Sequence, residues 1–464
     1  MAMSRIEKDY LGEIELPDEV YYGVQTARAL ENFQVSGITE RPELIRAYIL
    51  VKKAAALTNM ELGLLDEKRG NAIIKAADEV LAGKFQDQFP VDVFQAGAGT
   101  SFNMNVNEVL ANRALELLGH KKGEYDVLSP NDQVNMAQST NDTFPTASHI
   151  AVIMAVDELQ SVLSDLSGSF RKKGDEFGSI PKSGRTHLMD ATPLYLGDEF
   201  SAYAKAVDRA AGRIKQRRDD LLELPIGGTA VGTGANAHPR FRDTVMAKLC
   251  ELCTLDFIPP RDTFEALQSR VQLAALSGAL RELALELTRI ANDIRLLASG
   301  PTTGLAEIKL PAVQPGSSIM PGKINPVMAE CLNMVAFQVI GNDTAVAYAA
   351  QAGQLDLNVM TPVMTHNILQ SITILTNFLP AFTYRWVNCI EADEKRCRDY
   401  LELNPSMATL LTPKIGFLEA AKLAKEAYER RISVPKLAVE KGLITEKEAE
   451  EIFNPNKVAQ SKYK

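Results

Sequence analysis

The segment from Gln314 to Val327 carries four side chains suited to acid–base chemistry or to holding an anion. They are the hydroxyls of Ser317 and Ser318, the ammonium of Lys323 and the amide of Asn325. Two glycines and three prolines in fourteen residues exclude an ordinary helix or strand, because proline has no N–H group and glycine disfavours both. We therefore expect a shaped loop that approaches an anion closely. A plain Ser/Gly/Pro surface loop is the alternative.

Three further polar segments, at residues 95–113, 135–146 and 184–193, each lead toward an expected helix. Helix N-termini approached through glycine bind carboxylates well, because unpaired N–H groups point at the ligand. A helix cap explains only one of the four consecutive polar side chains at 139–142. A lone histidine is more often structural than functional. The segments supply these candidate binding residues: Thr100, Ser101, Ser139, Thr140, Asn141, Thr186 and His187.

Long helices are expected to position these segments. Apolar residues recur at alternating spacings of four and three in five stretches, 152–170, 196–214, 276–297, 328–339 and 368–379. This spacing places an apolar stripe along one helix face and predicts coiled-coil-like packing. Each helix would be about thirty residues and about 45 Å long. Alanines on the other faces of the second stretch also indicate helix packing between subunits.

Shorter elements surround this bundle. Helices are predicted from Pro42 to just before Gly63 and from the cap Asp66 to Gly83, and two of the long helices are expected to begin at Pro145 and Pro193. Residues 1–38 lack sustained periodicity, so we expect an extended arm with turns.

The predicted domain order has three parts. An N-terminal helical domain would span residues 1–138, a long-helix bundle domain 139–393 and a small helical C-terminal domain 394–464. Within the last, helices are expected near 418–430 and 446–453. A chain of 464 residues exceeds what one core usually supports, which agrees with several domains.

Composition narrows the classes of partner. The formal charge is -9, from 50 Lys plus Arg against 59 Asp plus Glu, and no dense basic run stands out. Nucleic acid or an anionic membrane surface favours the opposite sign, so neither is expected as a partner. No apolar run is long enough to span a bilayer and no cleavable leader is evident, so a cytoplasmic location is expected.

The five cysteines suit a reducing compartment, because they are few and odd in number. Cys250 and Cys253 form one C-x-x-C pair without a second pair or a suitably placed histidine. Helical periodicity around them favours buried thiols over a metal site.

The string Gly-Ser-Ser-Ile-Met-Pro-Gly-Lys-Ile-Asn-Pro at 316–326 closely resembles the signature of the fumarase/aspartase superfamily. The strings at 5–13 and 21–26 resemble its N-terminal segment, and the resemblance covers essentially the whole chain. It implies a mainly α fold with a bundle of five long helices per subunit. It also implies a homotetramer with a central twenty-helix bundle and active sites that each draw segments from three subunits.

The resemblance further implies a β-elimination of a small dicarboxylate. A proton leaves the carbon next to a carboxylate, and an amine or water leaves from the neighbouring carbon, through a doubly charged aci-carboxylate. By this resemblance Ser317 is the general base, and Ser318, Lys323 and Asn325 bind carboxylate oxygens. Ser101 would line the substrate site. The other candidate residues would each bind one of the three polar groups of the substrate. Thr100, Asn141 and His187 would hold the leaving amine, Ser139 and Thr140 one carboxylate, and Thr186, Lys323 and Asn325 the other. No metal or cofactor is expected.

Sequence details divide between the two branches of the superfamily. The aspartase-like segments, at 97–101, 139–141, 325–327 and 352–360, lie nearer the expected substrate than the fumarase-like segments at 227–234, 236–239 and 264–267. We therefore favour deamination of L-aspartate to fumarate and ammonia, with class II fumarate hydration as the alternative. Departures from the usual pattern occur at Met189, Thr302, Thr303 and Thr412.

Two rival interpretations remain. A helical homologue that has lost activity should lack the base or the lysine, but Ser317 and Lys323 are both present. Argininosuccinate- or adenylosuccinate-type lyases match the loop and the segment around Thr140 less well.

Overall fold

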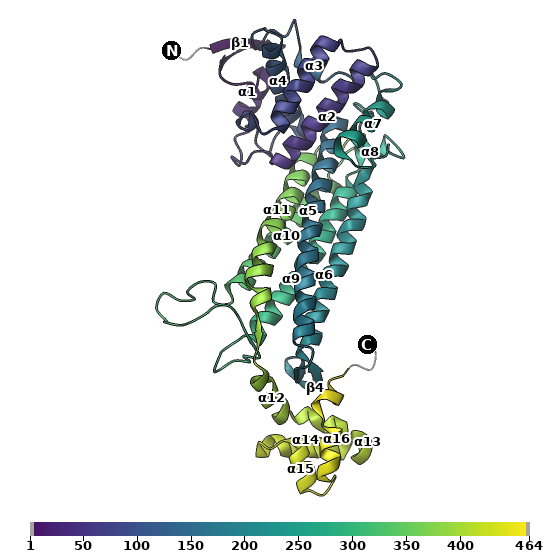
Figure 1. The fold of residues 1–464 in the computed structure, drawn as a ribbon. Coiled ribbons are helices and arrows are strands. Elements are labelled where there is room, and N and C mark those ends of the chain that lie inside the picture. The colour runs from purple at the N-terminus through teal and green to yellow at the C-terminus, as the bar shows by residue number, and fades with distance from the viewer. Residues whose placement is uncertain (1–3, 461–464) are drawn as a thin grey trace. The chain divides into compact units, whose positions relative to one another are not determined.

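The computed structural model describes residues 4–460, and the described chain is mainly α-helical, as predicted (Figure 1). Its strands form three two-stranded sheets. The chain divides into two compact units, each discontinuous in sequence. Unit 1 comprises residues up to 160, 212–282 and 337–375, and unit 2 comprises 161–211, 283–336 and the residues from 376 onward. The predicted division into three domains stays a prediction.

All five predicted long helices are present. They are α5 (Thr140–Glu176), α6 (Leu196–Asp219), α9 (Val271–Leu297), α10 (Val327–Gln351) and α11 (Thr361–Arg385). Each contributes one segment to each unit. Four of the predicted apolar stripes are buried throughout, including Leu159 and Leu166 of α5 and Leu283 and Leu287 of α9. The stripe of α10 is buried only in part, at Leu332 and Val339.

Shorter helices build the rest of unit 1. They are α1 (Val24–Asn32), α2 (Pro42–Glu61), α3 (Glu67–Leu81), α4 (Thr100–Leu117), α7 (Phe241–Cys253) and α8 (Glu265–Gln268). Helix α2 packs against α3 and α7, and α3 packs against α4. The Asp66 side chain accepts a hydrogen bond from the Arg69 N–H and caps α3 as predicted.

The N-terminal segment is not the irregular arm that we expected. Strands β1 (Ser4–Asp9) and β2 (Gly12–Pro17) form an antiparallel hairpin, and α1 follows. Gly12 has φ of 125°, a conformation that favours glycine, so it closes the turn without strain. The hairpin was missed because its two strands have only six residues each.

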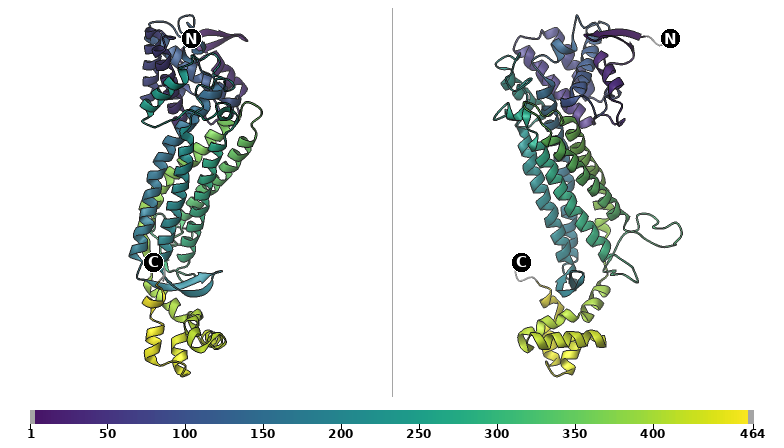
Figure 2. Two further views of the ribbon diagram at one scale, coloured as in Figure 1. Left: turned by 90° about the vertical axis from the view of Figure 1, so that its right-hand side faces the viewer. Right: turned by 180° about the vertical axis from the view of Figure 1, so that it is seen from behind.

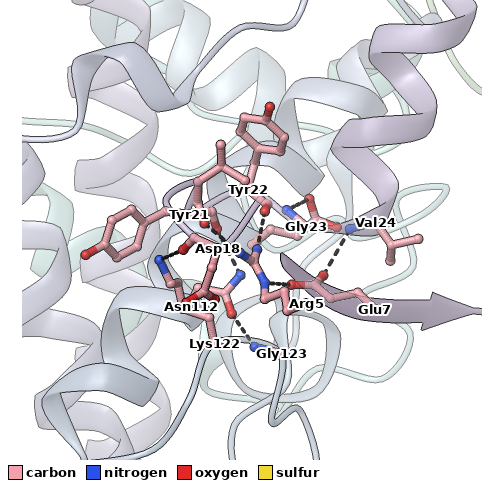
Figure 3. Close-up of polar contacts among 12 residues, drawn as sticks. Arg5, Glu7, Asp18, Tyr21, Tyr22, Gly23, Val24, Asn112, Lys122 and Gly123 are labelled. Carbon is pink, nitrogen blue, oxygen red and sulfur yellow. Dashed lines mark hydrogen bonds and ion pairs between the residues drawn. The ribbon is translucent and has the colours of Figure 1, made fainter. Parts of the chain in front are cut away.

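Buried side chains fasten this hairpin to α1 and α4. Arg5 donates to Glu7 and to the carbonyls of Val20 and Tyr22, and Glu7 in turn accepts from the Val24 N–H at the start of α1 (Figure 3). Glu108 of α4 accepts from the N–H groups of Gly23, Gln25 and Thr26. Two carboxylates from other elements therefore satisfy the first N–H groups of α1, which no residue of its own caps.

Unit 2 contains the second and third sheets and the C-terminal helices. Strands β3 (Pro181–Thr186) and β4 (Met189–Tyr195) form a hairpin, and β5 (Ile308–Lys309) pairs with β6 (Glu391–Ala392). The helices are α12 (Glu394–Leu403), α13 (Thr412–Ile415), α14 (Phe417–Arg430), α15 (Val434–Glu440), α16 (Glu446–Ile452) and α17 (Pro455–Val458). Two of them, α14 and α16, match the helices predicted for this region. A separate apolar core that includes Leu411, Leu423 and Leu437 holds them together.

Among residues 4–460, no helix is both long enough and apolar enough to cross a membrane.

Candidate active site

The segment between β5 and α10 is a loop, as predicted, and it projects beyond the neighbouring helices of unit 2 (Figure 2). Within it the Ser317 Oγ accepts hydrogen bonds from the backbone N–H groups of Ile319, at 3.3 Å, and Met320, at 3.0 Å. Ser317 is half-buried, whereas Ser318 and Lys323 are exposed. Two N–H groups aimed at one hydroxyl oxygen would stabilise negative charge on it.

The loop is closed across its base by its own backbone. The Gly316 N–H donates to the Lys323 carbonyl at 3.0 Å, and the Asn325 Nδ2 donates to the Gly316 carbonyl at 2.6 Å. A Cβ at position 316 would lie 2.2 Å from the Lys323 carbonyl oxygen, so only glycine fits there. This closure holds Ser317, Lys323 and Asn325 in one ring of residues.

A half-open cleft of about 930 Å³ lies beside this loop in unit 2. Lys323 and Asn325 line it together with Arg295 and Lys309. Asp393 forms an ion pair with Lys309 at 3.0 Å, so part of the positive charge is compensated. The cleft offers space and cations for a small anion next to two of the predicted binding residues.

Thr186 and His187 lie at the tip of the β3–β4 hairpin, which corrects our expectation of a helix entered at Pro193. Thr186 pairs with Met189, and the two turn residues His187 and Leu188 have φ of 54° and 61°. Two-residue hairpin turns of this kind require positive φ at both positions. The tip is exposed, and α6 begins only at Leu196.

Thr100 and Ser101 begin α4 directly after a glycine turn, as predicted. Gly99 has φ of 82°, and a Cβ there would lie 2.0 Å from the Phe144 ring in the first turns of α5. The Tyr48 hydroxyl lies 3.1 Å from Asn103 Oδ1 of α4 and 3.0 Å from Thr143 Oγ1 of α5. The N-terminal turns of α4 and α5 are therefore held side by side.

Helix α5 begins at Thr140, five residues before the start that we predicted at Pro145. The Ser139 Oγ accepts from the Asn141 N–H, and Asp142 Oδ1 accepts from the Ser139 N–H, which is a reciprocal cap. Pro145 is tolerated because it lies within the first two turns, where its missing N–H removes one hydrogen bond near the helix end. The cap uses two of the four polar residues, Ser139 and Asp142.

The glycine-rich segment at 227–234 packs against this helix start. Asp142 Oδ2 accepts from the N–H groups of Gly227, at 3.1 Å, and Thr229, at 2.8 Å. Asn141 Nδ2 donates to the Ala230 carbonyl at 2.7 Å. Burial raises the pKa of Asp142 to about 7, although the three N–H donors oppose the shift.

A buried lysine, Lys52 of α2, contacts the residues that precede α5. Lys52 Nζ donates to Asn135 Oδ1 at 2.9 Å and to Gln138 Oε1 at 3.0 Å. Burial lowers its pKa to about 7, while Asp142 acts in the opposite direction. Asn103 also donates to Asn135, so one polar network connects α2, α4 and the residues before α5.

A buried carboxyl group, that of Glu40, supports the start of α4 through Gln95. Gln95 Oε1 accepts from the Phe102 N–H at 2.8 Å, and its Nε2 donates to Glu40 Oε1 at 3.1 Å. Glu40 is 4% exposed, and burial, reinforced by Asp92, raises its pKa from 4.5 to about 8. Its stabilising contribution is therefore complete below its unfolded pKa and is lost as the pH rises through about 8.

We expect the substitution Glu40→Gln to remove this pH dependence. Gln keeps the acceptor for Gln95 but carries no charge. As the pH rises from 5 to 9, the native chain should therefore lose about 3–5 kcal/mol in free energy of unfolding relative to the variant. Urea unfolding across this pH range measures the difference. The exposed Glu158→Gln in α5 is the control and should leave the pH profile unchanged. Parallel profiles for Glu40→Gln and the native chain would contradict the prediction.

The structure thus gathers the predicted residues in two groups. Unit 1 holds Thr100 and Ser101 near the Ser139–Asn141 segment, and unit 2 holds the hairpin tip and the 311–326 loop. Among residues 4–460, no hydrogen bond joins the tip of the β3–β4 hairpin to the 311–326 loop.

Comparison with known proteins gives the family. Residues 12–341 match the family described as "Lyase", and residues 407–460 match the family described as "Fumarase C C-terminus". An aspartate ammonia-lyase from Bacillus sp is 50% identical over 451 residues, which cover 97% of this chain and 96% of that protein. The chain belongs to the fumarase/aspartase superfamily.

Other members of the superfamily are about as similar. A class II fumarate hydratase from Neisseria meningitidis is 47% identical over 453 residues, 97% of this chain and 98% of that protein. A crystal structure of a fumarate lyase:delta crystallin from Brucella melitensis superimposes with a TM-score of 0.96 at 44% identity, covering 99% of this chain and all of that one. The predicted membership, the fold and the assignment as an enzyme of the lyase class are confirmed.

Among residues 4–460, no group of three or more His, Cys, Asp or Glu side chains is arranged to hold a metal ion. Cys250 and Cys253 lie at the end of α7 and are partly buried, and burial raises the pKa of Cys253 to about 11.

The sequence did not reveal that Asp142 binds the 227–234 segment and so holds it against the start of α5. The spacing Ser139-x-x-Asp142 is a capping signal, and it could have placed the helix start correctly. Nothing local in the sequence indicates that Asp142 also binds a segment 85 residues away.

Proposed function

We propose that the chain catalyses the reversible deamination of L-aspartate to fumarate and ammonia by anti β-elimination, with Ser317 as the general base. The observation that supports this most directly is the pair of N–H groups, from Ile319 and Met320, that donate to the Ser317 Oγ. A serine is a poor base unless its alkoxide is stabilised, and these two donors supply that stabilisation. Several relatives at 46–50% identity are named aspartate ammonia-lyase.

The chemical difficulty is the charge on the intermediate. Removing a proton next to a carboxylate spreads a second negative charge onto a group that already carries one. Oriented N–H groups and a cation stabilise such an aci-carboxylate best where water is excluded. Lys323 and Asn325 beside the cleft are suited to one carboxylate, and the helix start at Ser139 and Thr140 to the other. Thr186 would assist Lys323, and Ser318 would add a further donor.

The leaving amine needs different partners. Thr100 is exposed at the start of α4, Asn141 lies at the start of α5, and His187 is exposed at the hairpin tip. We assign these three side chains to the amine, and Ser101 to the wall of the substrate site. A histidine side chain can act as a general acid or base, which suits a leaving group that departs as ammonia.

We further propose a homotetramer in which each site draws on several subunits. Its support is the outer face of α10, where Met334, Phe337 and Tyr348 recur at helical spacing and are 64%, 57% and 66% exposed. A stripe of large apolar side chains on a long helix is typical of a helix-packing interface. We expect a cytoplasmic location, with no nucleic acid or membrane partner.

Hydration of fumarate to L-malate is the second candidate function. Its support is the class II fumarate hydratase at 47% identity, which covers the chain as completely as the aspartate ammonia-lyases do. The same base and carboxylate sites would serve both reactions, so the groups around the leaving atom decide between them.

One assay separates the two functions. Purified protein is mixed with L-aspartate or L-malate, and fumarate is followed by its ultraviolet absorbance. We expect fumarate to form from aspartate, and to be consumed when ammonia is added. Turnover of malate without turnover of aspartate would overturn the assignment in favour of the hydratase.

We expect Gly316→Ala to lower activity without loss of stability. The added Cβ would collide with the Lys323 carbonyl and break the closure of the loop, so kcat should fall by about 10²-fold. Because the loop is exposed, the thermal midpoint should move little. The control is Gly168→Ala in α5, where a Cβ meets nothing within 4 Å. Full activity in Gly316→Ala would show that loop closure does not matter.

A further inference from the structure

Four charged side chains meet at the base of the β3–β4 hairpin in unit 2. Lys182 Nζ lies 2.9 Å from Glu199 Oε1 and 2.9 Å from Glu307 Oε2. The side chains of Lys182 and Glu307 are 1% and 0% exposed. Arg185 also forms an ion pair with Glu307. The four charges sum to zero, which is how such a buried cluster avoids an unpaired ion.

Both terminal nitrogens of the Arg185 guanidinium contact the Glu307 carboxylate. Its Nη1 donates to Glu307 Oε2 at 2.9 Å, and its Nη2 lies 2.9 Å from Oε1 as an ion pair. The Tyr400 ring lies 5.6 Å from the guanidinium carbon. A two-point contact of this kind fixes orientation as well as distance.

Arg185 and Glu307 are adjacent in sequence to the two segments of unit 2 that carry candidate site residues. Arg185 immediately precedes Thr186, and the hairpin tip with His187 follows. Glu307 immediately precedes β5, after which the loop with Ser317 begins. The Glu307 backbone is itself held, because its N–H donates to the Leu297 carbonyl at 2.9 Å and its carbonyl accepts from the Asp393 N–H at 2.9 Å.

We propose that Glu307 is a positioning residue that, through Arg185, holds the His187 hairpin and the base of the Ser317 loop on one rigid support. This inference rests on the proposed function, in which both segments act on the same class of substrate. Glu307 touches no substrate. It sets where the hairpin tip and the loop start.

The alternative is that the cluster only stabilises the fold. Buried ion pairs are a poor means to that end, because an apolar pair of similar size is often as stable or more so. An apolar pair is not directional, so it does not hold two backbone segments in one fixed orientation. Replacement of the contact by apolar side chains therefore separates the two roles.

The test uses Arg185→Met, which leaves Glu307 paired with Lys182, and the double variant Arg185→Met/Glu307→Met, which leaves Lys182 paired with Glu199. We expect kcat for L-aspartate to fall by about 10²-fold in the double variant, while KM changes by less than about threefold, because misplacement acts on the reacting geometry. The thermal midpoint should stay within a few degrees of the native value. Arg185→Lys, which keeps the charge, should recover part of kcat.

Hydrogen–deuterium exchange provides a readout that does not depend on activity. Arg185→Met should speed amide exchange at 305–310, and Glu307→Met should speed it at 181–190, so each substitution loosens the other segment. The control is Arg171→Met, which breaks an exposed ion pair with Asp208 in the same unit and should alter neither segment.

The outcomes are distinguishable. If the native chain turns over neither aspartate nor malate, the proposed function fails, and the exchange data still decide whether Glu307 couples the two segments. If the native chain is active and the double variant keeps kcat within threefold, or if exchange is not reciprocal, the positioning role is overturned and the proposed function stands.

Discussion

Ser317→Ala should abolish turnover of L-aspartate while leaving the fold intact. The substitution removes the oxygen that accepts the Ile319 and Met320 N–H groups, and with it the only group that we assign to proton removal. Loss of a general base typically reduces the rate by 10²–10⁴-fold, and we expect about 10³-fold or more because no neighbouring hydroxyl has the same pair of donors. Fumarate formation and washout of the substrate C3 proton into deuterated water measure the loss.

The controls for Ser317→Ala separate catalysis from binding and folding. Fumarate affinity, measured by calorimetry, should change by less than about threefold, because the base contributes little to ground-state binding. Ser161→Ala, on an exposed position of α5, should keep both turnover and stability. Retention of more than a tenth of native turnover in Ser317→Ala would remove this serine as the base.

The sequence predicted well those features that depend on local composition or on helical periodicity. The 311–326 loop follows from its prolines and glycines, and the long helices follow from their apolar stripes, which bury Leu159, Leu283 and their equivalents. These patterns need no knowledge of distant contacts, because each is written within one or two helical turns.

The β3–β4 hairpin could not be predicted in the same way. Its strands contain Pro181, Gly184 and Pro193, which usually interrupt strands, and its turn is His187-Leu188 rather than an Asn-Gly pair. Tertiary contacts hold it instead. Asn404 donates to the Ser183 hydroxyl and to the Ala191 carbonyl, more than two hundred residues along the chain.

Two helix starts differ from their predicted positions because of proline. Proline is common at the first helical position, so the sequence predicts helix starts at Pro145 and Pro193. In α5 the reciprocal cap between Ser139 and Asp142 outweighs that preference and moves the start to Thr140. The candidate residues at 139–141 therefore lie on the first turn of the helix, where N–H groups are available to an anion.

The second large effect is expected at this helix start. Asp142→Ala removes one buried carboxylate that accepts from three backbone N–H groups, those of Ser139, Gly227 and Thr229. A buried donor left without a partner costs about 1–3 kcal/mol, so we expect the free energy of unfolding to fall by about 3–5 kcal/mol after partial relaxation. Urea unfolding at constant pH measures it, and Asp243→Asn, 77% exposed at the side chain in α7, should change it by less than about 0.5 kcal/mol.

Asp142→Asn gives a sharper version of the same argument. The amide has the shape of the carboxylate, but one of its two ends is an NH₂ group that must face a backbone N–H, either that of Ser139 or those of Gly227 and Thr229. If the carboxylate serves as an acceptor on both sides, Asn should recover less than half of the stability lost in Ala, and activity should remain low because the 139–141 turn and the 227–234 segment separate. Near-native stability in Asp142→Asn would mean that one side of the contact suffices to hold the helix start.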